Sequence, residues 1–201
     1  MHDDVHWNYM ARSYTLKRRA EQQAETRRRI VEAAVELHST VGPARTTVSM
    51  LAERAGVQRH TLYAHFPDEW SVLLACSGHV LERDPLPNPE PWRAIQDPRE
   101  RVRTGLGAIY GWYARNAAVL ACTLRDSEHH APTREINELR FWPAMAAYRE
   151  ILGAELDARD HALLLLALSF HTWRTLVQEA SLEQADAAAA MVEAICSARI
   201  S

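Results

Sequence analysis

The chain has 201 residues, of which 47% are hydrophobic and 24% charged, a composition typical of a globular protein with one large or two small domains. The formal net charge of −3 gives no overall sign of a polyanion partner, and the opening MHDDVHWNYM lacks the apolar segment of a signal peptide. The longest uncharged run, from His161 to Trp173, is shorter than the roughly 18 residues of a spanning helix, so we expect a cytoplasmic protein without membrane contact.

Charge is distributed unevenly along the chain. Residues 12–59 hold ten basic and five acidic side chains, whereas residues 81–201 hold 13 basic and 17 acidic ones. One end therefore suits a phosphate surface that the other would repel. Residues 1–20 show no helical or strand periodicity and end in Lys-Arg-Arg. We interpret them as a flexible basic arm that either reaches for DNA or is a solvated tail without a role.

Four helices are predicted in the first part of the chain. Apolar positions at helical spacing predict one over residues 25–41, ended by a Gly-Pro pair. Thr46 or Thr47 can cap a second helix, and Gly56 suits the left-handed turn that follows it. A third helix over residues 57–65 comes almost without a loop, and a Phe-Pro pair then opens a fourth, which runs to about residue 83.

The segment DPLPNPEPW places proline at every second position, so it can form neither a helix nor a central strand. We interpret it as the boundary between a DNA-binding domain, residues 21–83, and a second domain, residues 84–201. Nothing beyond it alternates like a strand, and the predicted fold is all-α. The second domain is predicted to have helices starting at Asp97 and Pro132, a kink at Pro143, one long helix over residues 157–180 and a last helix after Ser181.

Two helices joined by a short turn that contains Gly are the signature of a helix-turn-helix, whose second helix enters the major groove. Here that helix is residues 57–65, and its first turn carries four side chains that suit base edges: Gln58, Arg59, His60 and Thr61. The side chains better placed for phosphate are Tyr63 and His65 on the same helix, and Arg45, Thr46, Thr47 and Ser49 before or at the start of the preceding one. We favour DNA binding over a small bundle with a solvated polar face, because turn chemistry, local charge and outward donors agree.

These residues also carry a resemblance. The runs RRRIVEAAVELHSTVG and TTVSMLAERAGVQRHTLYAHF, within residues 25–80, resemble the amino-terminal domain of the TetR/AcrR family of transcriptional regulators. The resemblance implies that the remaining chain is an all-α domain that dimerises and binds a small effector. It also implies base and phosphate contacts at Thr47 and at the third-helix positions named above. Two positions depart from the family: Glu69 stands where a phosphate-touching Lys is common, and His60 stands where a small residue is common.

An effector site is predicted in the second domain, where aromatic residues gather with a few polar ones. Large rings suit either an apolar pocket between helices or an ordinary core, and both interpretations stay open for each ring. The candidate effector-binding residues are Tyr110, Tyr113, Asn137, Trp142, Phe170, His171 and Trp173. The last two helices are the predicted dimer elements, because the long one has more apolar faces than a monomer can bury and the last one carries small apolar residues that permit close approach of a second subunit. We therefore expect a homodimer interface at Ala185, Ala188, Val192 and Ile195.

No catalytic motif, metal site or cofactor site is predicted. The three cysteines lie far apart, and the Asp126–His130 cluster lacks the spacing that would bring its side chains to one point. The leading hypothesis is a ligand-responsive regulator, most often a repressor in proteins of this resemblance, that leaves a pseudo-palindromic double-stranded operator when a small apolar or aromatic effector binds. The alternatives are a small-molecule binding protein that has lost DNA recognition and, least favoured, an all-α enzyme.

Overall fold

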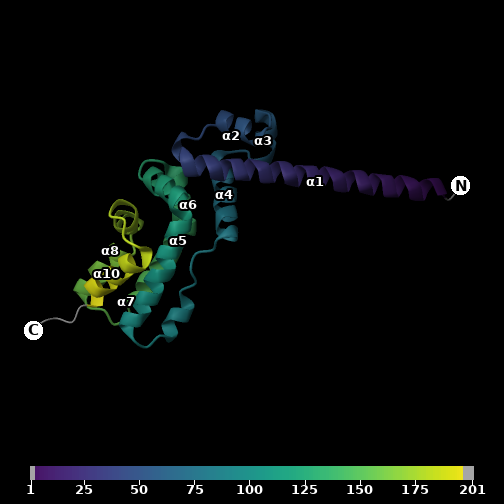
Figure 1. Ribbon diagram of the computed structural model, residues 1–201. Coiled ribbons are helices and arrows are strands. Elements are labelled where there is room, and N and C mark those ends of the chain that lie inside the picture. The colour runs from purple at the N-terminus through teal and green to yellow at the C-terminus, as the bar shows by residue number, and fades with distance from the viewer. Residues whose placement is uncertain (1–2, 197–201) are drawn as a thin grey trace, which may run out of the picture.

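The structure is a computed structural model that describes residues 3–196, with side chains from residue 17 onward. Every regular element in this range is a helix, which confirms the all-α prediction (Figure 1). In chain order the elements are α1 (Asp3–Thr40), η1 (Pro43–Arg45), α2 (Val48–Ala55), α3 (Arg59–His65), α4 (Glu69–Arg83), η2 (Glu90–Ala94), α5 (Pro98–Ser127), α6 (Ala131–Arg140), α7 (Trp142–Gly153), α8 (Ala158–Ala167), α9 (Phe170–Arg174), the π-helical η3 (Thr175–Glu179) and α10 (Gln184–Cys196).

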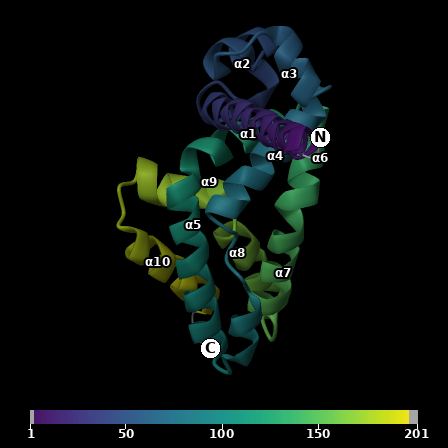
Figure 2. The same ribbon diagram turned by 90° about the vertical axis from the view of Figure 1, so that its right-hand side faces the viewer.

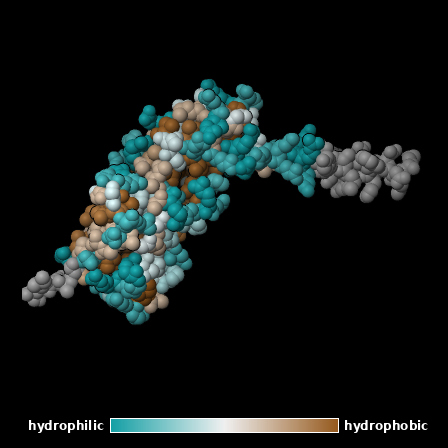
Figure 3. Space-filling view, viewed as in Figure 1, coloured by the Kyte–Doolittle hydropathy of each residue, from teal (hydrophilic) through white to brown (hydrophobic). Residues whose placement is uncertain are grey.

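The first helix is much longer than its sequence pattern predicts. Residues 1–20 were expected to be an irregular arm, but α1 begins at Asp3, and its first half projects from the body (Figure 1). The physical reason is that residues 3–20 contain neither Gly nor Pro, so nothing interrupts a helix that the buried second half already holds in place. The surface of α1 is hydrophilic where it leaves the body (Figure 3). Residues 1 and 2 lie outside the described residues.

Helices α1–α4 surround a small core. α2 and α3 lie on one side of α1, and α4 crosses its other side (Figure 1). Leu62 and Phe66 point inward, at 2% and 1% exposure, as the helix-turn-helix pattern requires. They pack with apolar residues of α1, α2 and α4, which are mainly Ile30, Ala34, Leu51, Ala52 and Val72.

Local capping rules place the boundaries of α2 and α3. The Thr47 hydroxyl accepts a hydrogen bond from the Met50 amide (3.2 Å), so Thr47 and not Thr46 caps α2. Gly56 ends α2 with a φ of 64°, the left-handed geometry predicted for it. Gln58 is the N-cap of α3, which therefore begins at Arg59, two residues later than predicted. Caps and turn together fix the direction in which α3 presents its first turn.

The second part of the molecule, from η2 to α10, is built around α5, which runs through its length (Figure 2). Asp97 caps α5 as predicted, and α10, α6 and α7 pack along it. α6 and α7 are separate helices that meet at Phe141, where a kink at Pro143 was expected. Pro143 lies in the first turn of α7, where its missing amide donor costs no helical hydrogen bond. The predicted division at residues 83 and 84 remains a prediction.

The long helix expected over residues 157–180 is interrupted. α8 ends at Ala167, α9 begins at Phe170, and the π-helical η3 follows it. Two buried tyrosines of α5 explain the break: the Tyr110 hydroxyl donates to the carbonyl of Ala167 (3.0 Å) and the Tyr113 hydroxyl to that of Leu168 (2.6 Å). These bonds satisfy carbonyls that a helix end leaves without partners. The sequence pattern shows an apolar run but cannot show these long-range donors.

Candidate nucleic-acid interface and effector cavity

The first turn of α3 is an exposed polar surface. Gln58, Arg59 and His60 are exposed, Thr61 is half-buried, and Tyr63 is 51% exposed one turn further on. The Arg59 side chain makes no hydrogen bond or ion pair with any side chain from residue 17 to 196. These groups come from one short helix whose opposite face is locked by Leu62, so they can be presented together to one surface.

The residues around the start of α2 are partly engaged already. The Thr46 hydroxyl donates to the Gly42 carbonyl (2.8 Å), and Thr47 accepts from the Met50 amide. Thr47 keeps its hydroxyl proton for an outside acceptor, because capping uses only its oxygen lone pair. Arg45 and Ser49 are exposed. His65 is half-buried, and its carbonyl accepts from Arg27 (3.3 Å).

Part of the basic charge counted in this region is neutralised within the fold. Arg28 pairs with Glu25 (2.7 Å) and Glu32 (2.5 Å) along α1, and Arg54 of α2 pairs with Glu36. Arg27 lies over the ring of Phe66, 4.2 Å from its centroid. Arg45 and Arg59 lie outside these pairs, so their charge remains available to a phosphate surface.

Glu69, which departs from the family pattern, lies in the first turn of α4 and contacts α6. Its carboxylate lies 3.3 Å from Nε2 of His130, the residue that precedes α6. The other ring nitrogen of His130 contacts the Thr133 hydroxyl at 2.7 Å. Glu69 therefore joins the two parts of the molecule, at a position where the family commonly has a phosphate contact.

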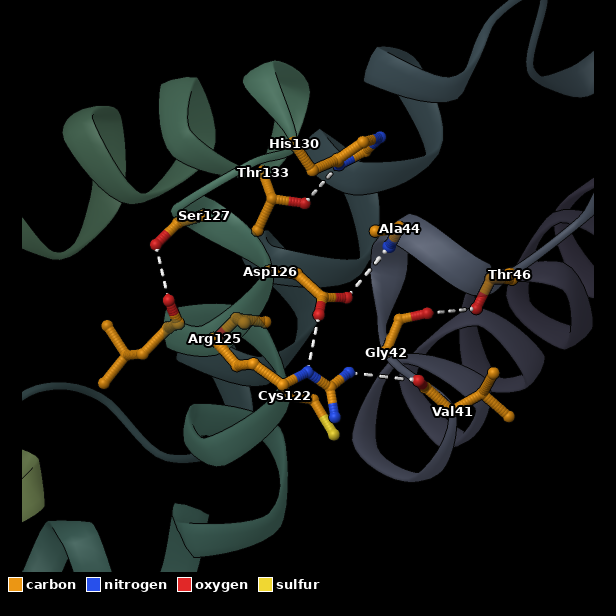
Figure 4. A network of polar contacts seen from close by, with 12 residues as sticks. Val41, Gly42, Ala44, Thr46, Cys122, Arg125, Asp126, Ser127, His130 and Thr133 are labelled. Carbon is orange, nitrogen blue, oxygen red and sulfur yellow. Dashed lines mark hydrogen bonds and ion pairs between the residues drawn. The ribbon is translucent and has the colours of Figure 1, made fainter.

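A second connection between the parts is the α5–η1 joint, formed by Val41, Gly42, Ala44, Arg125 and Asp126 (Figure 4). The Asp126 carboxylate is 1% exposed and accepts from the Ala44 amide (3.0 Å) and from Arg125 (2.8 Å). Arg125 also donates to the Val41 carbonyl (3.2 Å). Burial acts to raise the pKa of Asp126, but its hydrogen bonds outweigh burial and hold that pKa below its usual value. The carboxylate is thus charged and ties the end of α5 to the turn that precedes α2.

Gly42 is required where this joint is most crowded. Its φ of 98° and ψ of 153° lie in a region that is essentially restricted to glycine. A Cβ at this position would also lie 2.5 Å from a carboxylate oxygen of Asp126, and still closer to the Arg125 guanidinium. The close approach of α5 to this turn depends on the missing side chain.

A small apolar cavity of about 90 Å³ lies between the two parts. α1 and α4 form one wall, and α5, α6 and Phe141 form the other. Nearly all of its surface is apolar. The residues that line it are Val35, His38, Leu73, Cys76, Ser77, Val80, Leu81, Leu86, Trp112, Val119, Leu120, Thr123, Thr133, Ile136, Asn137, Arg140 and Phe141.

His38 and Cys76 satisfy each other on the inner wall of this cavity. Their Nδ1 and Sγ atoms lie 3.3 Å apart, and both side chains are buried. Burial lowers the pKa of His38 to about 4 and raises the pKa of Cys76 to about 12. At neutral pH both groups are therefore uncharged, and the inner wall of the cavity carries no charge.

A larger hollow of about 550 Å³ lies in the second part, where residues of α5, α7, α8 and α9 line it. It is lined by four of the predicted effector residues, which are Tyr113, Trp142, Phe170 and His171. Asn137 lines the smaller cavity. Tyr110 and Trp173 line neither of these two spaces. They are 0% and 1% exposed and pack in the core, so the core interpretation holds for these two.

The structure corrects three of the four residues of the predicted dimer interface. Ala188, Val192 and Ile195 are buried within the single chain, at 6%, 3% and 0% exposure, because this stripe of α10 packs against α5 and α8. Ala185 is exposed. A stripe at helical spacing shows that a helix buries one face but not whether its own chain or a second copy covers it.

The comparisons with known proteins agree with this architecture. The family model described as bacterial regulatory proteins, tetR family, matches residues 30–76. Two HTH-type regulators of Pseudomonas putida, SrpR and TtgW, are each 35% identical over 150 residues, or 73% of this chain. The match covers 60% of SrpR and 96% of TtgW. The chain belongs to the TetR family.

A solved structure shows the same fold. FadR from Bacillus subtilis, in complex with stearoyl-CoA, superposes with a TM-score of 0.57 at 18% identity, over 84% of this chain and 97% of that one. TetR-family proteins are transcriptional regulators and not enzymes, in agreement with the expectation that this chain is a regulator. Within residues 3–196, no helix of this TetR-family chain is long and apolar enough to span a membrane.

Sequence reasoning missed the residues that connect the two parts of this TetR-family chain. Asp126 was considered only as a member of a metal-like cluster, and Gly42 only as a helix stop. No signal in the sequence pairs residue 42 with residue 126. The inward-pointing His38 did carry a signal, because it lies four positions after Ala34 and eight after Ile30, on the buried face of the same helix.

Proposed function

We propose that this chain is a dimeric, ligand-responsive and sequence-specific regulator that represses transcription until a small effector releases it from a pseudo-palindromic operator. The observation that carries the proposal is the exposed first turn of α3, held by Leu62 and the caps of α2 and α3. Gln58 and Arg59 have the donor geometry that suits adenine and guanine edges. Membership of the TetR family supports the same conclusion.

Selection of bound duplexes from a random DNA pool, followed by sequencing, tests this proposal. A dimer with two recognition helices should enrich a two-fold symmetric motif with half-sites about one turn of DNA apart. Failure to enrich any motif, from protein shown to be folded and dimeric, would contradict sequence recognition. It would favour the alternative, a small-molecule binding protein that keeps the fold without reading DNA.

Replacing Arg59 with alanine should weaken binding to the selected duplex by about 1–3 kcal/mol and relax specificity at one base position. Tyr63→Ala should instead weaken binding about equally across sequences, because a phosphate contact carries no base information. Competition titrations with the selected duplex and with single-base variants distinguish the two outcomes. Unchanged affinity and specificity in Arg59→Ala would show that Arg59 does not read a base.

We propose that the dimer forms through the outward faces of α8 and α10. Leu165 and Leu166 are 49% and 53% exposed, and Leu165 also lines the larger hollow. The exposed alanines of α10 at positions 185, 189 and 190 lie on the neighbouring helix. Together they form an apolar surface that a second copy of the chain would cover.

Replacing Leu166 with glutamate should therefore weaken dimerisation at least about tenfold, since a charge would be buried between subunits. Leu139→Glu is the matched control, because Leu139 is 52% exposed on α6, away from this surface. Sedimentation equilibrium measures the dimer affinity of both variants. Equal dimer affinity in the two variants would place the interface elsewhere.

An effector can act here because α4 itself lines the smaller cavity, and the larger hollow shares Phe141 with that cavity. A ligand that fits only one arrangement of the helices that line these spaces shifts the conformational equilibrium toward that arrangement. The size of the shift is set by the difference in the ligand's affinity for the two states. FadR, which shares the fold, was solved with stearoyl-CoA, and this supports a largely apolar ligand for the present chain.

A further inference from the structure

The cavity between the two parts has walls from both of them, so its occupant would touch the DNA-binding helices directly. Val35 and His38 of α1 and Leu73, Cys76 and Val80 of α4 face Leu120 and Ile136 across it. Its volume of about 90 Å³ is below the roughly 150 Å³ of an apolar cavity that accommodates benzene. A ligand of benzene size or larger therefore has to displace part of the wall as it enters.

One cationic side chain lies at the boundary of this cavity. Arg140, the last residue of α6, lines the cavity and also lines the surface hollow between α1 and α4. Its Nη2 atom lies against α4 at Gly78, 3.7 Å from where a Cβ would stand. Arg140 is exposed and forms no ion pair with any side chain from residue 17 to 196.

The charges near Arg140 leave it available to an anion. The outer hollow also contains Arg27, Arg28, His79 and Glu82. Arg28 is neutralised by two glutamates of its own helix. Glu82 is the acidic side chain that lines this hollow, and no ion pair joins it to Arg140. The inner wall, by contrast, is uncharged, because His38 and Cys76 are both neutral.

We propose that this cavity binds an aliphatic carboxylate, with the alkyl chain between α4 and α5 and the carboxylate on the Arg140 guanidinium. Guanidinium and carboxylate match in geometry, and an alkyl chain replaces water on an apolar wall. A chain that fills more than the present volume has to displace a wall, and α4 is the wall that leads into the helix-turn-helix. The regulatory consequence rests on the proposed function, whereas binding itself does not.

Calorimetric titration of the purified full chain, without DNA, compares octanoate with 1-octanol. These probes share a chain length and differ in charge. Octanoate should bind more tightly than octanol. Arg140→Gln should lower the affinity for octanoate roughly five- to tenfold and change the affinity for octanol by no more than about twofold. Arg134→Gln is the matched control, since Arg134 is exposed on the same helix but does not line the cavity, and it should change neither affinity.

The position of the alkyl chain is tested by Val119→Phe. Val119 is half-buried and lines the cavity, so a larger ring fills the space while its exposed side can still relax. This variant should lower the affinity for both octanoate and octanol. Three results would each overturn the proposal. The wild type could bind octanoate and octanol with equal affinity, Arg134→Gln and Arg140→Gln could change octanoate affinity equally, or Val119→Phe could keep full affinity for both probes.

The regulatory step has its own measurement. Octanoate should lower the affinity of the wild-type chain for the selected duplex, and should require a roughly five- to tenfold higher concentration to do so with Arg140→Gln. An unchanged duplex affinity at saturating octanoate would overturn the effector role. A chain that selects no duplex but binds octanoate would instead contradict the proposed function and leave the ligand assignment intact.

Discussion

Gly42→Ala is expected to lower the free energy of unfolding by about 2–4 kcal/mol and to weaken binding to the selected duplex at least about tenfold. Alanine rarely adopts the φ of 98° found here, and its Cβ would overlap Arg125 and Asp126. The α5–η1 joint would have to open, which strips the Ala44 amide and the buried carboxylate of their hydrogen bonds. Urea unfolding and duplex titration measure the two effects.

Gly107→Ala is the matched control for this substitution. Gly107 lies within α5, and a Cβ there would meet no atom within 4 Å. Alanine should therefore raise stability by about 0.5–1 kcal/mol through helix propensity alone, without changing DNA affinity. If Gly42→Ala behaved like Gly107→Ala, the crowding described for the α5–η1 joint would be wrong. Loss of stability with unchanged DNA affinity would show that the joint does not position α2 and α3.

Lowering the pH from about 6.5 to about 4 should remove about 3 kcal/mol of stability because His38 is buried in its neutral form. The folded pKa of about 4 lies below the unfolded value of 6.5, so within this interval the unfolded state binds the proton and the folded state does not. Stability is therefore complete above pH 6.5 and falls until the folded protein also binds the proton. Burial is the main cause, His130 acts in the same direction, and Asp126 opposes both.

Urea unfolding at a series of pH values measures this loss, and His38→Gln should flatten the curve between pH 6.5 and 4. His60→Gln should leave it as in the wild type, since His60 is exposed on α3. Titration of Asp126 does not overlap with that of His38 in this pH interval. The pKa of Asp126 is held below its ordinary value, so its contribution is present above about pH 4 and is lost only at more acid pH. Parallel curves for the wild type and His38→Gln would show that His38 is not buried in the neutral form.

The helix-turn-helix could be predicted closely because its determinants are local. Thr47, Gly56 and Leu62 each act within a few residues of chain, through a cap, a left-handed turn and a buried face. The same rules correctly predict that Gln58, Arg59 and His60 are exposed. The assignment of Gln58 and Arg59 to base contacts remains a prediction, since only a DNA complex or a titration tests it.

The remainder depends on contacts between distant parts of the chain. The break after Ala167 follows from hydroxyl groups some 55 residues away, namely those of Tyr110 and Tyr113. The inward face of α10 depends on α5, and the charge of Asp126 depends on the Ala44 amide. Periodicity reports that a face is apolar and cannot identify its partner, and three of the four predicted dimer residues of α10 belong to the core of the chain itself.

The length of α1 gives small movements at the cavity a large reach. Val35 and His38 form part of the cavity wall, and the same uninterrupted helix continues outward past Gln22. Sixteen residues of helix span about 24 Å, so a tilt of about 5° at His38 would displace Gln22 by about 2 Å. α1 can thus act as a lever that pivots beside this cavity. Spin labels at Gln22 in the two subunits would report, as a change in their separation, a rearrangement too small to detect at the cavity itself.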